Sequence, residues 1–557
     1  MILIKRFFLC SIVIIGLFVA LFSTYAAEIE SVIPAYSPGY VSVENVSGIW
    51  DALRVSPVWS GILSSGNLDY AIAQMEEQFG VELQTLMGAF GRRVAFVQTN
   101  IFPDPDGMAK SAVIIDVEDL EGATEVVQRM QQSLNSKEEI EVRPDAGTYR
   151  GVPFGAIRHR GEQLPFRYTF LGNLFVFALG QDSFEALADV YLGEEPSLIY
   201  DPKFNRTCAD ISGENEIFAY ANMELLWPFM QATWDPDMKQ IMQILGAYEI
   251  KSIAYTANLL SPTREQEMYV FTGAIGGFPL TSMFMGDQPL SSPHLIPASG
   301  SHTFFAMHLG DPMVVWEMVT NSVRNVMGER EYGDMQSSIS EFEWETGLSL
   351  NSDILSSLTG EVGFSMPLAA IIGITAGGPT AMFRGGFMMF CGVADREKCA
   401  TAIEKIFSAA SIQTQQKEYK GVKIHEIFAL SSMEFPVGYM FAGDLLIFGN
   451  FKRLEAIINE EPPLVVSEAF FSINSRLPWQ PGLIWYMDLK SAVEMLWQLG
   501  LLNQPEEYIE RLKALGSVGG GMSQDGEGLR VSWSGTLGTS WLETIGEIAA
   551  LLNGISR

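Results

Sequence analysis

The sequence predicts an α+β protein of two homologous tandem domains, each a largely antiparallel sheet with helices packed on one side. Two observations predict this fold. The same blocks of sequence recur in the same order about half the chain apart, and apolar runs of strand length are joined by turns too short for a parallel connection. We expect a signal peptide over residues 1–26, a first repeat domain over 27–280, a connector over 281–291 and a second repeat domain over 292–557.

The repeat is visible in short matched blocks. "VIPA" is matched by "LIPA", "YRGVPFGAI" by "YKGVKIHEI", and "FLGNLFVFALG" by "FAGDLLIFGN". The distance along the chain between matched positions is nearly constant: Pro34 to Pro297 is 263, Tyr149 to Tyr419 is 270, Gly172 to Gly443 is 271, and Tyr220 to Tyr486 is 266. Chance similarity does not preserve order and spacing together, so we interpret the two halves as homologous domains.

Hairpins are predicted at matching places in the two copies. Gly172 and Asn173 separate two apolar runs in the first copy, as Gly443 and Asp444 do in the second. Such two-residue turns accept positive φ angles and match the twist of antiparallel strands. The pairs "EIKSIAYTANLL" with "EMYVFTGAI", and "SVGGGMSQ" with "LRVSWSGTL", predict further antiparallel strands.

Helix ends are predicted from capping residues. Asp182 or Ser183 is the expected N-cap of the helix that contains "FEALADVYL". In "SLNSDILSSLTG", Asn351 or Ser352 is the expected N-cap of a short helix and Gly360 its C-terminal stop, before the strand "EVGFSM". A hairpin followed by a helix is typical of α+β folds.

The N-terminus has the pattern of a secretory signal peptide. Lys5 and Arg6 precede an apolar run, and Thr24 and Ala26 occupy the small-residue positions before a cleavage site. We therefore expect an exported protein, periplasmic or extracellular, cleaved near Ala26. The alternative is a retained N-terminal membrane anchor, because the apolar run is only slightly short of a bilayer span.

The composition is that of an acidic globular protein. Hydrophobic residues make up 48% of the 557 residues and charged residues 18%, which predicts packed cores rather than disorder. Removal of the signal peptide leaves 33 of the 35 basic residues against 66 acidic ones, a net charge of −33. Such a surface repels phosphate groups, so we expect no nucleic-acid binding.

The block order resembles a known family. "IPA", "LTGEVGF", "YKGVKIHEI", "GYMFAGDLLIFGNFKRLEAI" and "GLIWYMDL" occur in the order found in exported bacterial proteins of the domain of unknown function family 3352. The resemblance covers most of the mature chain, although "FGVELQTLMGAFGRR" in the first copy is a weaker version of its block. It implies an exported protein, but it carries over no reaction and no site residues.

Sequence motifs of catalysis are missing. The chain contains no G-x-S-x-G elbow, P-loop, H-E-x-x-H or dinucleotide fingerprint, and only five histidines. We therefore expect no enzyme, and we assign no catalytic, cofactor-binding or metal-binding residues.

One group of residues suits a transition metal by type. His294, His302 and His308 cluster in the sequence with Asp311, and on a strand His302 and His308 share one face. The first copy has no histidine in the matching region. We therefore favour isolated histidines at this place over a metal site.

"FPDPDG" resembles the start of a calcium loop, with Asp104 and Asp106 before Gly107. It is too short for one, and we expect a plain hairpin turn there.

Three cysteines remain after the signal peptide. Cys391 ends an apolar run and Cys399 lies in the following helix, so a bridge between them is one alternative. Three isolated thiols, with Cys208 as the third, are the other. The two alternatives are equally supported.

The second copy has an uncharged stretch, Pro367 to Phe383, where the first copy has "FPDPDG". Its prolines and glycines argue against a transmembrane helix. It is either a loop folded onto its own core or an exposed apolar tip that contacts a membrane surface, an apolar ligand or a partner protein.

The leading interpretation is therefore an exported, non-catalytic protein with a binding or scaffolding surface in the cell envelope. One alternative is a carrier of an apolar, lipid-like ligand covered by residues 367–383. The other is a hydrolase whose catalytic residues assemble only in the folded chain. The expected partner is a protein or an apolar ligand, without a cofactor.

Overall fold

The computed structural model contains two compact units. The first comprises Met1–Thr233, Ile250–Phe271 and Thr539–Arg557, and the second Trp234–Glu249 and Thr272–Gly538. The structure describes residues 29–55, 67–90, 92–100, 110–160, 166–209, 211, 216–258, 260, 266–273, 289–367, 386–430, 436–477, 481–498, 506–513 and 516–536.

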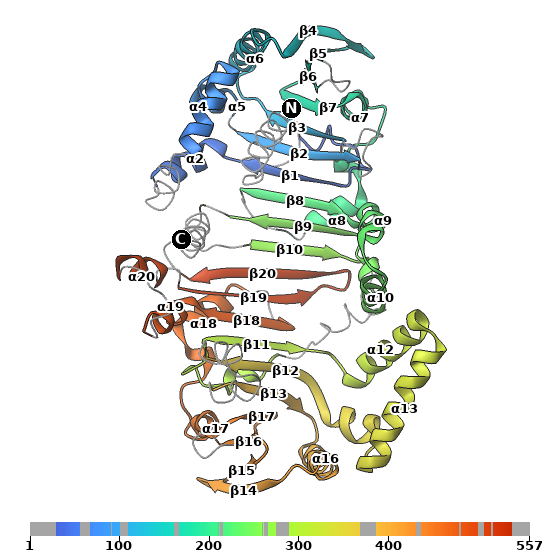
Figure 1. Ribbon diagram of the computed structural model, residues 1–557, viewed down its shortest axis with the longest axis vertical. Helices are drawn as coiled ribbons and strands as arrows, with labels where there is room; N and C mark the ends of the chain where they lie inside the picture. The colour runs from blue at the N-terminus through green and yellow to red at the C-terminus, as the bar shows by residue number, and fades with distance from the viewer. Residues whose placement is uncertain are drawn as a thin grey trace. The chain divides into compact units, whose positions relative to one another are not determined.

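The first unit contains an antiparallel sheet (Figure 1). Its strands follow the order β10-β9-β8-β1-β2-β3-β7-β6-β5-β4, and every neighbouring pair is antiparallel. The bounds are β1 Gly39–Glu44, β2 Arg93–Asn100, β3 Lys110–Asp116, β4 Ile140–Tyr149, β5 Val152–His159, β6 Phe166–Leu171, β7 Leu174–Leu179, β8 Ile217–Asn222, β9 Ser252–Ala257 and β10 Gln266–Phe271.

The second unit has the same strand order, with each strand ten numbers above its counterpart. The order is β20-β19-β18-β11-β12-β13-β17-β16-β15-β14, again antiparallel throughout. The bounds are β11 Thr303–His308, β12 Leu358–Met366, β13 Met388–Val393, β14 Thr414–Tyr419, β15 Val422–Ile427, β16 Val437–Ala442, β17 Leu445–Asn450, β18 Leu483–Asp488, β19 Ser517–Gln524 and β20 Gly528–Thr536.

Helices complete both units, so the fold is a mixture of helices and antiparallel sheet, as predicted. The first unit has α2 Val46–Val55, α4 Asn67–Phe79, α5 Leu83–Phe90, α6 Leu120–Asn135, α7 Gln181–Tyr191, η1 Leu198–Tyr200, α8 Pro202–Ala209 and α9 Met223–Thr233. The second has α10 Pro236–Leu245, η2 Ala247–Glu249, η3 Ser292–His294, α12 Pro312–Met327, α13 Glu329–Thr346, η4 Leu350–Ile354, η5 Leu355–Ser357, α16 Arg396–Ala409, α17 Phe451–Ile458, η6 Leu464–Val466, α18 Glu468–Asn474, α19 Leu489–Gln498 and α20 Glu506–Lys513.

The predicted hairpin turns are confirmed. Gly172 and Asn173 join β6 to β7, and Gly443 and Asp444 join β16 to β17. Both glycines have positive φ, 61° and 53°. The predicted pairings of β9 with β10 and of β19 with β20 are also present.

The prediction that helices pack on one side of each sheet is wrong. In the first unit, Ala112 and Ile114 of β3 belong to the core cluster that contains residues of α7 and α8. Ile115 of the same strand packs in the cluster with residues of α5 and α6. Alternate residues of a strand point to opposite faces of the sheet. A strand with apolar residues on both faces is therefore covered by helices on both faces.

The second unit has the same two-faced packing. Met388 and Phe390 of β13 lie in the cluster with α17 and α18. Val393 of the same strand lies in the cluster with Cys399 and Ile403 of α16. In both units the central strands are therefore covered on both faces.

The predicted caps are corrected by the structure. The N-cap of α7 is Gly180 rather than Asp182 or Ser183, because the helix begins at Gln181. The N-cap of η4 is Ser349, whose side chain accepts from the backbone N of Ser352.

Gly360 does not end a helix. It lies inside β12 with a φ of 95°. The strand therefore starts before the glycine that was expected to precede it.

Candidate functional site

The four residues considered for a metal do not form a site. His294 is exposed in η3, and His308 ends β11, where its Nδ1 accepts from the backbone N of Gly310 at 3.2 Å. Asp311 caps α12 by accepting from the backbone N of Met313 at 2.8 Å. Burial lowers the pKa of His302. Among the residues that the structure describes, no three His, Cys, Asp or Glu side chains are placed to hold a metal ion.

The three cysteines are free thiols, so the Cys391–Cys399 bridge is not formed in this structure. Burial, and to a smaller degree the neighbouring Cys399, raise the pKa of the Cys391 thiol to about 12. Burial also raises the pKa of Cys399 and of Cys208. The reactive thiolate is therefore scarce at neutral pH.

We expect these thiols to resist alkylation. At pH 8 the folded chain should incorporate iodoacetamide at Cys391 at least about ten times more slowly than the chain in denaturant, because the thiolate fraction falls tenfold per unit of pKa. Incorporation at Cys208 and Cys399 should also be slower than in denaturant. Mass spectrometry of quenched samples measures this rate. Equal rates in the two conditions would contradict the buried thiols, and one alkylated cysteine in denaturant without reductant would reveal a bridge.

A buried ion pair anchors the N-terminal segment of the first unit. Glu30 and Arg93 are 2% and 3% exposed. Arg93 Nη1 donates to Glu30 Oε2 at 3.0 Å, and Nη2 contacts Oε1. Tyr40 Oη also donates to Glu30, at 2.7 Å, and Ser42 accepts from Arg93 at 3.2 Å. Burial lowers the pKa of Arg93, but the attraction and hydrogen bonds of Glu30 outweigh it and raise the pKa.

The second unit places a carboxylate where the first has this arginine. Arg93 pairs with the last residue of β1, and Glu361 pairs with the last residue of β11. Glu361 is 4% exposed and accepts from the backbone N of Ser291 and of Ser292, both at 2.9 Å. Both charged groups therefore hold the segment that precedes the "IPA" block, which is a structural role.

A second buried arginine lies in the second unit. Arg453 of α17 donates to the hydroxyls of Ser301 at 2.9 Å and Ser365 at 3.1 Å, and it contacts the carbonyl of Ser299. Burial lowers its pKa to about 10. Its guanidinium lies against Gly300, where a Cβ would come within 2.8 Å of Nη1. The arginine therefore fixes the turn before β11 and is used within the fold.

Four large exposed side chains, three of them tyrosines, lie on neighbouring segments of the first unit, since the segment of Tyr36 is hydrogen-bonded to the segment that precedes Tyr200. Tyr36, Tyr191, Leu192 and Tyr200 expose 46%, 47%, 40% and 75% of their surface, and we call them the tyrosine patch. Tyr191 and Leu192 end α7, and Tyr200 ends η1. Partial burial raises the pKa of Tyr36, and the nearby carboxylates of Glu195 and Asp189 raise it further. Tyrosine is enriched at protein interfaces, because it offers a large contact area with a polar end.

The backbone beneath the patch is fixed by hydrogen bonds. Pro34 forms a bridge with Ser197, and the backbone N of Leu198 donates to Ile33 O at 2.8 Å. Leu198 is fully buried in the main core cluster. The exposed side chains therefore stand on an ordered frame rather than on a loose loop.

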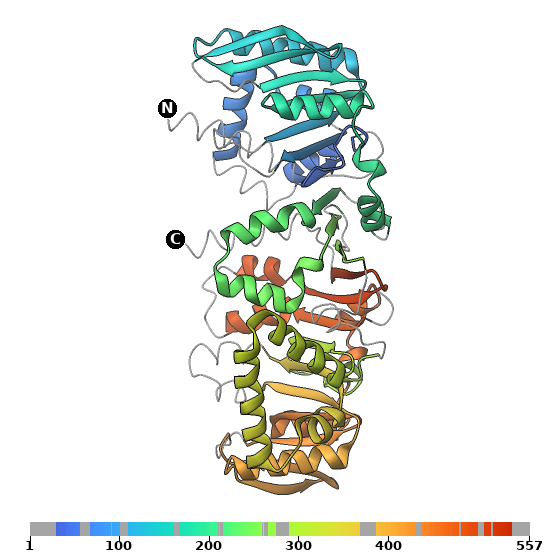
Figure 2. The ribbon, with the colours of Figure 1, turned by 90° about the vertical axis from the view of Figure 1, so that its right-hand side faces the viewer.

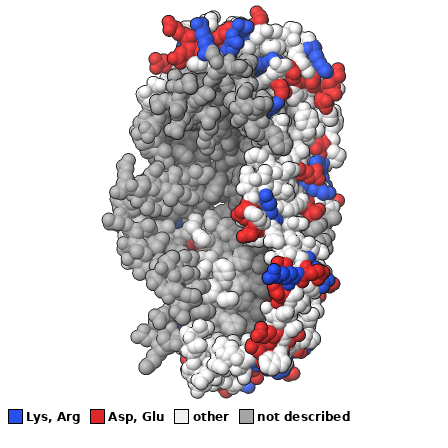
Figure 3. Space-filling model, turned by 45° about the vertical axis from the view of Figure 1, so that its right-hand side comes forward, with Lys and Arg blue, Asp and Glu red and all other residues white. Residues whose placement is uncertain are grey.

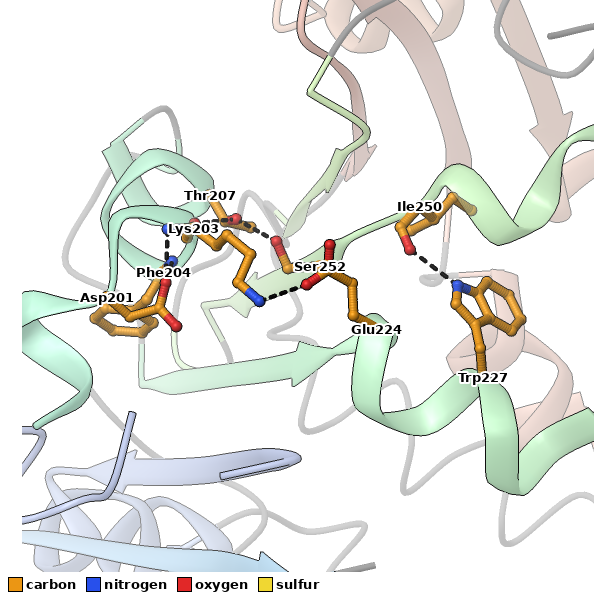
Figure 4. Close-up of polar contacts among 8 residues, drawn as sticks. All are labelled: Asp201, Lys203, Phe204, Thr207, Glu224, Trp227, Ile250 and Ser252. Atoms are coloured by element: carbon orange, nitrogen blue, oxygen red, sulfur yellow. Dashed lines mark hydrogen bonds and ion pairs between the residues drawn. The ribbon is translucent and has the colours of Figure 1, made fainter. Parts of the chain in front are cut away.

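Figure 4 shows the polar network that continues this frame from Asp201, the residue after Tyr200. Asp201 accepts from the backbone N of Lys203 at 2.7 Å and of Phe204 at 3.4 Å, which caps α8. Lys203 Nζ pairs with Glu224 of α9 at 2.7 Å. Two bonds attach α8 and α9 to the sheet region: Thr207 Oγ1 with Ser252 Oγ at 2.6 Å, and Trp227 Nε1 to Ile250 O at 2.9 Å. Asp201 therefore fixes the backbone that follows Tyr200, and the other bonds hold α8 and α9 within the fold.

The second unit repeats the frame but changes the exposed residues. Pro297 bridges Pro463, and Leu464 is buried as Leu198 is. At the end of η6, Val466 is 63% exposed, and Phe471 of the adjacent α18 is 60% exposed. Exposed apolar residues therefore recur at the corresponding place of both units.

The charges of the described surface are mixed. On the face in Figure 3, acidic and basic side chains lie in groups with uncharged surface between them. The formal net charge of the chain is −31, so its long-range field favours cationic partners.

No sequence motif marks the tyrosine patch. Its members come from two segments about 160 residues apart, which only the fold joins. One difference between the copies points to the patch: "IPAY" in the first copy corresponds to "IPAS" in the second, so Tyr36 stands where the second copy has a serine.

The comparisons with known proteins give little. No family model matches the chain, and no curated protein matches it. Among solved structures, the match to crystal form III of TP0453 covers 46% of this chain and 84% of the TP0453 chain, with 7% sequence identity and a TM-score of 0.25. The match to crystal form I of TP0453 covers 44% of this chain and 80% of the TP0453 chain, with 8% sequence identity and a TM-score of 0.24. Likeness this weak supports no inference about function.

Several predicted features lie outside the described residues. They are the signal peptide, the "FPDPDG" turn and the apolar stretch after Pro367. Within the part of the chain that the structure describes, no helix is long and apolar enough to cross a membrane.

Proposed function

We propose that this chain is an exported, non-catalytic binding or scaffolding protein of the cell envelope, and that the tyrosine patch contacts a protein partner. The observation that carries the proposal is the patch itself, four large side chains held 40% to 75% exposed on a hydrogen-bonded frame. Large exposed apolar groups that gather on a rigid surface usually mark a contact site. The signal-peptide pattern supports export.

We also propose that the two units are homologous tandem domains. The shared strand order supports this, as do the matching bridges at Pro34 and Pro297. A matched cap supports it too. Glu76 accepts from the backbone N of Leu83 at 2.8 Å, and Glu343 accepts from that of Leu350 at 2.7 Å. The resemblance to the domain of unknown function family 3352 agrees with this proposal.

Site-specific photo-crosslinking in the native cell tests the binding role. A crosslinking amino acid in place of Tyr200 should give one discrete protein adduct, identified by mass spectrometry. Replacing Tyr36, Tyr191 and Leu192 by Ser should reduce that adduct about tenfold or more, because loss of a single interface hot spot, worth about 2 kcal/mol, already lowers affinity by more than tenfold.

Glu125 provides the control, since it is exposed on α6, which packs in a different core cluster of the same unit from α7. The crosslinker at Glu125 should give no such adduct. An adduct of equal yield from both positions would contradict the proposal. A lipid-sized adduct on the mature protein in native mass spectrometry, unaffected by the serine substitutions, would favour the carrier alternative instead.

A further inference from the structure

Trp344 is the most exposed large apolar side chain among the described residues. It lies on α13, which is the long yellow-green helix of Figure 2, and 84% of its surface is accessible. A tryptophan exposed to this degree loses the hydrophobic stabilisation that burial would give, about 25 cal/mol per Å². The stability of the fold therefore does not explain why a tryptophan occupies this surface position.

The backbone around Trp344 is fixed. Glu343 accepts from the backbone N of Leu350 at 2.7 Å, and Gly347 ends the helix in the left-handed conformation. Lys405 of α16 donates to the carbonyl of Gly347 at 3.0 Å. The indole therefore stands on a rigid helix end. A rigid backbone lowers the conformational entropy that is lost when a partner binds.

The matched helix end of the first unit shows that this fold does not require the indole. Glu76 and Glu343 form the same cap in the two units, so Glu77 occupies the position of Trp344. Glu77 is also exposed. A charged residue serves the fold at this position in one unit, and only the second unit carries a tryptophan.

The helix that carries Trp344 is acidic, although Lys405 of α16 lies at its end. Glu341 and Glu345 flank it on the same exposed side of the helix. The helix has one basic residue, Arg330, against six acidic ones: Glu329, Glu331, Asp334, Glu341, Glu343 and Glu345. Carboxylates beside an exposed indole oppose anionic lipid head groups and attract cations.

We propose that Trp344, with Glu341 and Glu345, docks an Arg- or Lys-rich segment of a partner protein. A guanidinium or ammonium group stacks on the face of the indole, and the two carboxylates attract the neighbouring charges of the segment. Tryptophan and arginine are the residues that most often dominate interface energetics. This inference deepens the proposed binding role by naming the chemistry of one partner, and it rests on that role.

Fluorescence anisotropy with the mature full-length protein tests the inference. The probe is a fluorescein-labelled peptide of alternating Arg and Gly, titrated at low and at physiological ionic strength. Trp344→Glu should weaken binding about fivefold, which is the effect of one exposed cation–π contact. Because this variant adds a negative charge, non-specific electrostatic attraction alone predicts the opposite change.

The control variants separate the contributions. Trp344→Phe should keep most of the affinity, and Glu341→Gln with Glu345→Gln should weaken binding and flatten its salt dependence. Glu331→Gln, near the other end of α13, should change affinity less than about twofold at physiological salt, because screening is strong at that distance. Far-UV circular dichroism checks that each variant is folded.

Two outcomes would overturn the inference. One is that Trp344→Glu binds the peptide as tightly as the unchanged protein, or more tightly. The other is flotation of the protein with phosphatidylcholine or phosphatidylglycerol vesicles that Trp344→Glu abolishes, which would assign the indole to a membrane surface. The crosslink at Tyr200 uses other residues in the other unit, so loss of the peptide effect with an intact crosslink would remove this inference alone.

Discussion

Replacing Glu30 by Gln should lower the free energy of unfolding of the first unit by about 3–5 kcal/mol. The substitution leaves the Arg93 guanidinium, which is 3% exposed, without its carboxylate in an environment of low dielectric constant. Tyr40 Oη would also lose the charged acceptor of its 2.7 Å hydrogen bond. Guanidinium-induced unfolding measures the change, and hydrogen exchange of β1 and β2 peptides assigns it to this unit.

The double variant Glu30→Met with Arg93→Met is the control for this prediction. Removing both charges removes the cost of burying them, so the double variant should recover most of the lost stability. If the single and double variants were equally unstable, the loss would come from packing rather than from an unpaired charge. If Glu30→Gln changed stability by less than about 1 kcal/mol, the pair would behave as an exposed salt bridge, contrary to its burial.

Local signals predicted the parts of the fold that depend on neighbours in the sequence. Gly172 with Asn173 and Gly443 with Asp444 identified their hairpins, because a two-residue turn with positive φ leaves the flanking strands little choice but to pair. Strand pairs joined by such turns are antiparallel by geometry. The sheet class therefore followed from a few residues.

The side on which helices pack did not follow, because it depends on non-local packing. Ile114 and Ile115 are both apolar, and an apolar run does not reveal whether one face or two are covered. The prediction of the α7 N-cap failed because the residue that starts this helix uses no side-chain cap. Gly180 has φ 81° and ψ 165°, a conformation that starts α7 without a side-chain cap, so the polar residues after it were misleading.

The candidate sites were beyond sequence reasoning because they join distant residues. Glu30 and Arg93 are 63 positions apart, and each taken alone resembles any other surface charge. Trp344 was detectable only as a difference between the copies, and that comparison needs the matched caps of Glu76 and Glu343 to fix the alignment. Motif searches look for residues that resemble known sites, whereas these residues are informative because two similar units differ.

Gly360→Ala is expected to destabilise the second unit by about 3 kcal/mol or more. The φ of Gly360 is 95°, and a Cβ there would lie well inside van der Waals contact with the backbone carbonyl of Gly310. The left-handed backbone costs an alanine about 1–2 kcal/mol, and overpacking adds about 1–3 kcal/mol. The strain would act beside Glu361, whose carboxylate holds Ser291 and Ser292.

Gly172→Ala is the matched control, because Gly172 has a φ of 61° with nothing within 4 Å of an added Cβ. This variant should show only the cost of a left-handed backbone, about 1 kcal/mol, so the excess loss in Gly360→Ala measures the clash with Gly310 together with the less favourable φ of Gly360. Chemical denaturation of both proteins gives the two free energies, and hydrogen exchange should show earlier opening of β11 and β12 in Gly360→Ala. Equal destabilisation would mean that the chain relaxes around the new methyl group, and that the approach of β12 to Gly310 does not fix the position of Glu361.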